Sequence, residues 1–286
     1  MPRDNGPLET AAAIMMRVAR SGSFAVVRVL ALNPGPFTLE GTNTWVVGRD
    51  GPIVIDPGPD DPGHVQAVLQ AAGRVGAILL THRHLDHAPA ADRLSQLTGA
   101  PIYAALPGED QRLANDGDRL EAGGVTLEVV ATPGHSPDHL VFLERDTGAL
   151  FTGDAVLGRG TSVIDPPEGD LSDYLRSLDR MRRLEPRIIY PGHGPVVEGA
   201  VRKIEEYLAH RRDRERQVLR ALEEGPHTPV ELVPGIYAEY PKDLHPAAAR
   251  SVLAHLLKLE REGRVVRSAR GDRFALTAPH RTAPSG

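Results

Sequence analysis

Short apolar runs alternate with amphipathic segments along the chain between about residues 24 and 194. Several runs are apolar at consecutive positions, which is typical of strands buried on both faces of a sheet. The segments between them repeat their apolar residues with a helical period, and two of them end at a glycine. The pattern predicts an α/β domain with helices packed on sheet faces. The expected strands cover residues 24–30, 42–47, 52–56, 75–81, 125–132, 139–144, 149–154 and 187–192, and the expected helices cover 62–73, 88–99 and 170–184.

The pattern changes near residue 200. Residues 201–224 are rich in charge, and their apolar stripe fails across 209–217, which predicts a connecting helix with a solvent-exposed middle. Two shorter helical patterns and two short strands around a Gly-Asp turn follow, which is the order of a winged helix-turn-helix domain. We therefore expect an N-terminal extension at 1–23, an α/β domain at 24–200, a connecting helix at 201–226 and a winged-helix-like domain at 227–286.

The net charge of −5 is the sum of two opposite balances. Residues 1–200 contain 17 Lys and Arg against 26 Asp and Glu, whereas residues 201–286 contain 16 against 12. In the basic C-terminal part, Arg264, Arg267 and Arg270 recur around the expected hairpin, where they could contact the phosphates of a nucleic acid. A solvated surface or a wing that forms a homodimer explains the same arginines equally well.

The first 20 residues contain only a short apolar run, from Ala11 to Met16, and two acidic side chains. This start does not resemble a signal peptide. No apolar stretch approaches the roughly 20 residues that a membrane helix needs. We therefore expect a cytoplasmic protein without a membrane partner.

The chain has 12 histidines and no cysteine. A metal site must therefore use His, Asp and Glu side chains. The sequence His82-Arg83-His84-Leu85-Asp86-His87 directly follows the expected strand 75–81. In extended backbone His82 and His84 point the same way, and Asp86 and His87 turn toward a second point as the chain bends into a helix. This spacing favours two neighbouring metals over one.

Three more expected strands end in a ligand-type residue beside a glycine: His135, Asp154 and His193. Glycine lets the backbone approach closely there while the imidazole or carboxylate projects. Four strand-end loops of this kind favour a metal centre over unrelated structural histidines. The other histidines, including His64, His210 and His255, are interpreted as structural or surface residues.

These residues, in this order, resemble the signature HxHxDH…H…D…H of the metallo-β-lactamase-fold hydrolases. The resemblance covers nearly all of residues 24–200 and implies an αββα sandwich with a binuclear site at one edge. Zinc is the expected metal for imidazole and carboxylate ligands without sulfur, and Mn or Fe fits the same donors. By resemblance one metal is held by His82, His84 and His135, the other by Asp86, His87 and His193, and Asp154 bridges them.

Two metals about 3.5–4 Å apart would share a hydroxide, lower the pKa of its parent water and polarise a carbonyl or phosphoryl oxygen. The catalytic residue is then Asp86, which would orient this nucleophile or carry its proton. No GxSxG elbow and no Walker loop is present in the sequence, so neither a serine hydrolase nor a P-loop enzyme is favoured.

Several residues near these loops have two interpretations. Asp56 resembles the family's aspartate that hydrogen-bonds a metal-binding histidine, but an Asp-Pro-Gly turn explains it as well. His139 either supports the ligands in the same way or begins the strand 139–144. The segment that contains Arg159, Thr161 and Ser162 is expected to line a substrate pocket, with Arg159 as an anion contact, or to form a surface loop.

The motifs LNPGPFTLEGTNTWVVG, FTGDAVLGRGTSV and YPGHGPV, with the arginine-rich helix and the terminal winged helix, resemble the beta-lactamase-like protein 2 group. That group includes an endoribonuclease acting on single-stranded RNA, and related proteins are thioesterases on polyketide carrier thioesters. The resemblance thus implies a metal-dependent hydrolase, with RNA as the preferred substrate and a small thioester, ester or lactone as the alternative. A non-enzymatic nucleic-acid-binding protein is the third hypothesis, which the intact ligand set disfavours.

Overall fold

The computed structural model describes residues 14–21 and 24–277 and divides the chain into two compact units. The first unit comprises residues 1–132, 138–161 and 184–201, and the second comprises residues 133–137, 162–183 and 202–286. These units do not follow the boundary expected near residue 200, because 162–183 group with the C-terminal part. No described helix combines the length and the apolar surface that a bilayer crossing requires.

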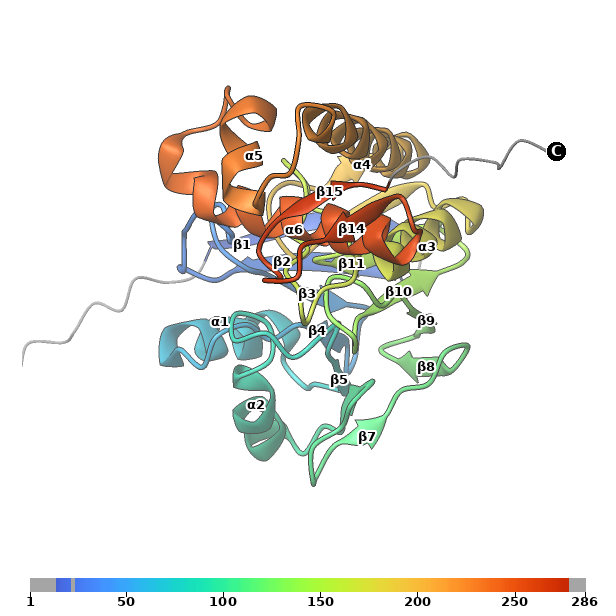
Figure 1. Ribbon diagram of the computed structural model, residues 1–286. Coiled ribbons are helices and arrows are strands. Elements are labelled where there is room, and N and C mark those ends of the chain that lie inside the picture. Colours follow the sequence, from blue (N-terminus) through green and yellow to red (C-terminus); the bar gives the residue numbers. More distant parts are fainter. Residues whose placement is uncertain (1–13, 22–23, 278–286) are drawn as a thin grey trace, which may run out of the picture. The chain divides into compact units, whose positions relative to one another are not determined.

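A seven-stranded sheet forms one layer of the first unit (Figure 1). Its first four strands pair antiparallel and the rest pair parallel. The first strand lies within 1–23, so that segment is not only an extension. In sheet order the strands are β1 (Ile14–Ser21), β2 (Phe24–Leu30), β3 (Asn43–Val47), β4 (Ile53–Ile55), β5 (Ala77–Leu79), β6 (Ile102–Ala104) and β7 (Arg112–Leu113).

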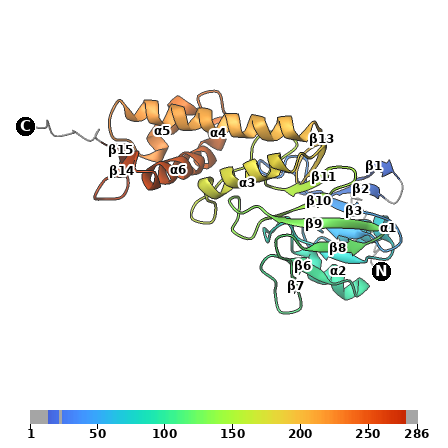
Figure 2. The ribbon, with the colours of Figure 1, turned by 90° about the vertical axis from the view of Figure 1, so that its right-hand side faces the viewer.

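A six-stranded sheet forms the second layer (Figure 2). Only β11 and β12 are parallel neighbours in it. The sequence pattern missed β1, β6, β7, β8 and β13, of which the last four are short or carry few apolar residues. In sheet order the strands are β13 (Val197–Glu198), β12 (Ile188–Pro191), β11 (Ala149–Gly153), β10 (Leu140–Glu144), β9 (Val125–Ala131) and β8 (Arg119–Ala122).

The main core lies between these two sheets. Trp45 of the first sheet contacts Phe151 and Tyr190 of the second, with ring centroids 6.4 and 5.1 Å apart. Every residue of β3 is buried, including the polar Asn43 and Thr44 that precede its apolar residues. The alternate residue Val46 packs on the opposite face in a core with residues of α1 (Pro62–Ala72) and α2 (Ala90–Thr98). Helices therefore cover that face of the seven-stranded sheet (Figures 1 and 2).

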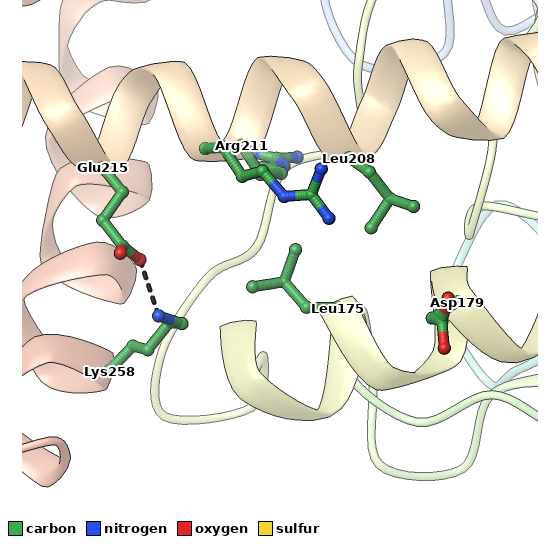
Figure 3. Close-up of a pocket in the computed structure, with 7 residues that line it drawn as sticks. Leu175, Asp179, Leu208, Arg211, Glu215 and Lys258 are labelled. Atoms are coloured by element: carbon green, nitrogen blue, oxygen red, sulfur yellow. Dashed lines mark hydrogen bonds and ion pairs between the residues drawn. The ribbon is translucent and has the colours of Figure 1, made fainter.

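The second unit is mainly helical and has its own apolar core. Arg211 is only 3% exposed in the longest helix, so the prediction that residues 209–217 are solvent-exposed is wrong at this position. Leu175, Leu208 and Arg211 line a cavity in this unit (Figure 3). Its elements are α3 (Leu171–Arg183), α4 (Ala200–Leu222), α5 (Pro229–Ile236), the 3-10 helix η1 (Lys242–Leu244), α6 (His245–Arg261), and the paired strands β14 (Val265–Arg267) and β15 (Phe274–Leu276).

Candidate metal centre

The residues expected to bind metal follow the ends of four strands. The run from His82 to His87 follows β5, and His135 lies in the loop between β9 and β10. Asp154 directly follows β11, and His193 lies two residues after β12. Because β11 and β12 are parallel neighbours, their carboxyl ends place Asp154 and His193 at the same edge of the sheet.

Asp86, His87 and His193 form one compact group. Their potential ligand atoms lie within 4.8 Å of one another. The Nε2 atom of His193 lies 3.0 Å from Oδ2 of Asp86, and the Nε2 atoms of His87 and His193 are 3.2 Å apart. Two imidazole nitrogens and a carboxylate oxygen at these separations match the donor chemistry of a divalent-metal site.

Asp154 lies beside this group and beside His82. Its Oδ1 atom is 3.4 Å from Nε2 of His87 and 3.4 Å from Nε2 of His193. His82, His87 and Asp154 form a second group within 4.8 Å. Asp154 thus lies where a carboxylate shared by two metal positions would be placed.

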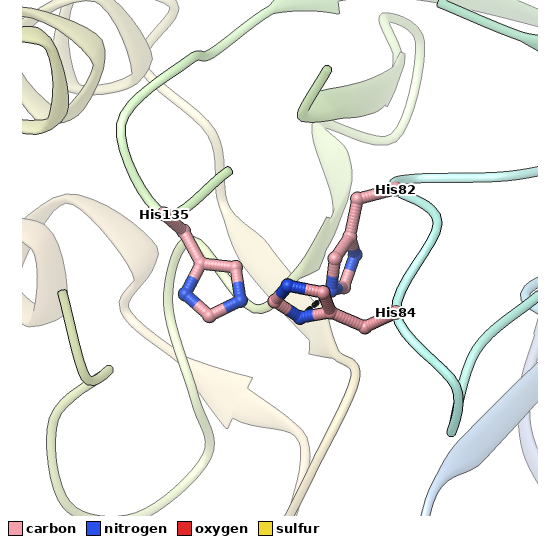
Figure 4. A group of neighbouring side chains, drawn as sticks. All are labelled: His82, His84 and His135. Carbon is pink, nitrogen blue, oxygen red and sulfur yellow. Dashed lines mark hydrogen bonds between the residues drawn. The ribbon is translucent and has the colours of Figure 1, made fainter. Parts of the chain in front are cut away.

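His82, His84 and His135 form the third group, drawn in Figure 4. Nε2 of His82 lies 2.9 Å from Nδ1 of His84. The structure therefore brings all seven predicted ligands into overlapping groups.

Thr81 and Asp56 hold two of the imidazole rings. The hydroxyl of Thr81 donates to Oδ2 of Asp56 at 2.7 Å, so its oxygen accepts the Nδ1 proton of His82 at 3.0 Å. The same carboxylate accepts the Nδ1 proton of His87 at 2.9 Å and the backbone N–H of Thr81 at 2.7 Å. Both rings are thereby fixed in the tautomer that leaves the Nε2 lone pair for a metal.

Backbone carbonyls hold two more rings. Nδ1 of His193 lies 3.2 Å from the carbonyl of Gly41, and Nδ1 of His135 lies 3.0 Å from the carbonyl of Val163. A protonated Nδ1 donates in each case, and Nε2 is again the metal-binding atom. Such supporting oxygens are the usual partners of metal-binding imidazoles.

His139 supports Asp154 through the backbone. Its Nε2 accepts the N–H of Asp154 at 3.2 Å, so the Nδ1 proton points to the hydroxyl of Thr132 at 3.0 Å. The ring also stacks on His82, with centroids 5.0 Å apart. His139 is buried, and it contacts the ligands rather than joining the groups of ligand atoms.

Gly192 leaves the space that the cluster occupies. A Cβ atom at this position would lie 2.7 Å from Oδ1 of Asp154 and 2.7 Å from Cε1 of His87. Such distances are far below van der Waals contact, so no side chain fits there unless a ligand moves. The glycine before His193 is thus a geometric requirement of the site.

The pKa values of the cluster show strong coupling between acids and bases. Burial opposes charge, but hydrogen bonds and charge from His193 and His87 lower the pKa of Asp86 and hold that of Asp154 well below its usual range. Burial would lower the pKa of His193, yet Asp154 and Asp86 raise it to about 9. The carboxylates therefore attract positive charge to the centre, which a divalent cation supplies.

Arg159, Thr161 and Ser162 lie in the segment that follows Asp154 and β11. Arg159 is 61% exposed at its side chain and pairs with Glu40 at 2.6 Å. Ser162 is buried, and its carbonyl accepts a hydrogen bond from Arg211. Their expected role in a substrate pocket stays a prediction.

Most of the arginines in and beside the wing, which is the hairpin of β14 and β15, form ion pairs with carboxylates. Arg264 lies 3.0 Å from Glu215, and Arg267 lies 2.8 Å from Glu260 and over the ring of Phe274. Arg270 is exposed. Contact of these arginines with a nucleic acid stays a prediction. The ion pairs of Arg264 and Arg267 weaken it, because a paired guanidinium is less available to a phosphate.

Thr81, Thr132 and Gly192 are the functional positions that the sequence analysis left out. The signal for Thr81 was its place between a buried strand and His82, and the signal for Gly192 was its place before His193. The carbonyls of Gly41 and Val163 carried no such signal, because any residue has a carbonyl.

Two family models match the chain. Residues 37–110 and 103–193 match the metallo-beta-lactamase superfamily, and residues 228–273 match the beta-lactamase-associated winged helix domain. These matches confirm the predicted sandwich fold with a C-terminal winged helix.

Similar proteins span most of the chain. A beta-lactamase-like protein 2 homolog of Caenorhabditis elegans is 36% identical over 84% of this chain and 86% of its own length. An atrochrysone carboxyl ACP thioesterase of Aspergillus fumigatus is 38% identical over 77% of this chain and 75% of its own. The crystal structure of a beta-lactamase domain protein from Burkholderia ambifaria is 25% identical, with a TM-score of 0.79 over 93% of this chain and 95% of its own.

Proposed function

Because this chain belongs to the metallo-β-lactamase superfamily, whose members are generally hydrolases, we propose that it cleaves a small acyl thioester or ester with two divalent metals. The observation that carries the hydrolytic part is the convergence of seven His and Asp side chains in three overlapping groups of ligand atoms. When bound, two divalent cations lower the pKa of water and polarise the oxygen of the bond to be cleaved.

Asp86 is the residue to which we assign proton transfer. Its side chain is 27% exposed, whereas that of Asp154 is 14% exposed. Water and substrate therefore reach Asp86 more readily. Its Oδ2 atom lies 3.0 Å from Nε2 of His193, so the carboxylate faces the cluster, which suits a group that positions a water and accepts its proton.

The acyl substrate is supported by the wing and by a relative. Arg264 and Arg267 are neutralised by Glu215 and Glu260, so the hairpin offers few unpaired cations to a phosphate backbone. The Aspergillus protein, 38% identical, is named a thioesterase. A thioester hydrolase needs no polyanion-binding track.

Single-stranded RNA is the second candidate substrate, because residues 201–286 carry more basic than acidic side chains. In this case exposed arginines such as Arg270 would hold the strand. The third hypothesis, a non-enzymatic nucleic-acid-binding protein, leaves the seven converging ligands without a role.

Zinc is the metal that we propose, with manganese and iron as alternatives that the same imidazole and carboxylate donors would accept. Metal analysis of the purified protein distinguishes the three. A content of about two metals per chain is expected. A protein that stays inactive after loading with zinc, manganese or iron would contradict the proposal.

The substrate is tested with protein loaded with zinc or manganese, an acyl N-acetylcysteamine thioester and an unstructured RNA. We expect thioester hydrolysis, reduced on the order of a hundredfold or more by Asp86→Ala. His245→Ala, which changes a partly exposed histidine outside the metal groups, should have no effect. Cleavage of the RNA without hydrolysis of any acyl substrate would overturn the acyl assignment in favour of the nuclease.

A further inference from the structure

A cavity of roughly 330 Å³ lies in the second unit, and none of its lining residues is a predicted metal ligand. Its walls come from three helices: Leu175 from α3, Leu208 and Arg211 from α4, and Lys258 from α6. Figure 3 shows Arg211 and Leu208 projecting from α4 toward Leu175. The volume is within the range of small-molecule sites.

Both acidic side chains of the wall are already neutralised. Asp179 pairs with Arg182 at 2.8 Å and with Arg183. Glu215 binds Lys258 at 2.6 Å and Arg264 at 3.0 Å. Each carboxylate thus has two cationic partners, and the wall keeps an excess of positive charge.

Arg211 and Arg212 carry this excess. Arg211 is 3% exposed, and its described partners are the carbonyl of Ser162 and the ring of Tyr174. Neither partner is charged, and the buried Nε–H of Arg211 has no hydrogen-bond acceptor among the described residues. Arg212 is exposed and has no ion-pair partner in the described part of the chain. A buried guanidinium N–H without an acceptor is costly, so the charge of Arg211 is poorly compensated by the residues around it.

Two histidines near these arginines, His210 and His255, also indicate positive charge in this part of the unit. Both ring nitrogens of His210 and of His255 are buried without a hydrogen-bond partner. Burial is the main reason that the pKa of His255 lies well below its usual range, and the charges of Arg211 and Lys258 lower it further. This part of the unit therefore has a positive potential that an anion would relieve.

We propose that this cavity binds a small organic phosphate, with the phosphate at Arg211 and Arg212 and an apolar body against Leu175 and Leu208. Guanidinium groups bind phosphate with paired, charge-assisted hydrogen bonds. The cavity exceeds the size of an inorganic phosphate, and its two leucines offer contact to a short hydrocarbon group. The proposal does not depend on which bond the metal centre cleaves.

The test is calorimetric titration of the full-length, metal-loaded protein with n-butyl phosphate. Saturable binding is expected, weakened about tenfold by Arg212→Gln and by Arg211→Lys, which keeps the charge but loses the planar fork. Arg216→Gln, at a 70% exposed arginine of the same helix outside the cavity, should bind within about twofold of the native protein. Arg212 is exposed, so Arg212→Gln should not affect folding. This variant alone tests the site if Arg211→Lys does not fold.

Two further titrations locate the site and its chemistry. His84→Ala, which removes a predicted metal ligand, should leave butyl phosphate binding unchanged, and loss of binding in this variant would place the ligand at the metal centre. Inorganic phosphate should bind more weakly than butyl phosphate. Equal affinities, or no saturable heat with either compound, would overturn the proposal.

Discussion

Each histidine of the metal centre is oriented by an oxygen at its Nδ1 atom, except His84, whose Nδ1 faces the ring of His82. Asp56 is the most connected of these supports, because one carboxylate accepts from Thr81 and from His87. The ring positions therefore depend on side chains that need not touch a metal.

Asp56→Asn should lower metal affinity about 10- to 100-fold. The substituted amide removes the negative charge behind His87. Its NH₂ group would also face either the N–H of Thr81 or the Nδ1 proton of His87, both of which the native carboxylate accepts. Competition with a chelator measures the affinity. Asp60→Asn, at a half-exposed carboxylate paired with Arg93, is the matched control, and equal affinities in both variants would contradict the supporting role of Asp56.

Gly192→Ala should reduce metal content and hydrolase activity together, the activity on the order of a hundredfold. The added methyl would lie 2.7 Å from both Asp154 and His87, so one ligand must shift. Gly235→Ala is the control, because a Cβ there meets no atom within 4 Å. Metal analysis and turnover of the two variants are compared, and a fully loaded, active Gly192→Ala protein would show that the loop has room to adjust.

The sequence predicted the ligands of this centre better than their supports. His, Asp and the neighbouring Gly at strand ends are unusual residue types in one repeated place, so His135, Asp154 and His193 stand out. The acceptors of Gly41 and Val163 are backbone groups whose position depends on the tertiary fold, and no residue type signals them. For Asp56 the residues alone showed the pattern of a turn, and only the family resemblance indicated a contact with a metal-binding histidine, because that contact with His87 joins residues 31 positions apart.

At the scale of elements, continuous apolar runs identified the buried strands, and helical periodicity identified the main helices. The pattern failed where tertiary contacts determine whether a polar side chain is buried. Arg211 interrupts the apolar stripe of α4, yet it is buried because its guanidinium lies over Tyr174 and donates to Ser162. A long arginine stem packs like an apolar side chain once its charged end has partners.

Thr228→Ala should lower the free energy of unfolding of the second unit by about 1 kcal/mol. Thr228 begins α5 with a capping box, in which its hydroxyl accepts from the N–H of Glu231 and the Glu231 carboxylate accepts from the N–H of Thr228. Urea unfolding followed by circular dichroism measures the change. Val230→Ala alters a 68% exposed side chain of the same helix and should cost much less; an equal loss would argue against the cap.

At the scale of the whole molecule, stability should depend on pH through histidines with a lowered pKa, which are His64, His210 and His255. Burial, followed by Arg211 and Arg214, lowers the pKa of His210 to about 4 despite the opposing charge of Asp213. The pKa of His255 is also lowered, by burial first. In the unfolded chain all three titrate near 6.5, so below that pH the unfolded state binds protons that the folded state does not.

The free energy of unfolding should therefore fall as pH decreases from about 6.5 toward 4, by at most about 1.4 kcal/mol per pH unit for each histidine. Denaturant unfolding over this range measures the slope. His255→Leu should flatten it relative to the native protein, whereas His245→Gln, at a partly exposed position, should not. A slope that both variants share would assign the effect to other groups.

Trp45 is the single tryptophan of the chain, and its place between the sheets has an optical consequence. Its indole N–H donates to the carbonyl of Pro191 at 3.0 Å, and Asn43 of the same strand donates to that carbonyl and to the carbonyl of Gly194. The first sheet thus holds the loop that carries His193. Separation of the sheets would expose this indole and shift its fluorescence to longer wavelength. Without an added label, the emission of one residue reports whether the edge that carries the metal ligands has assembled.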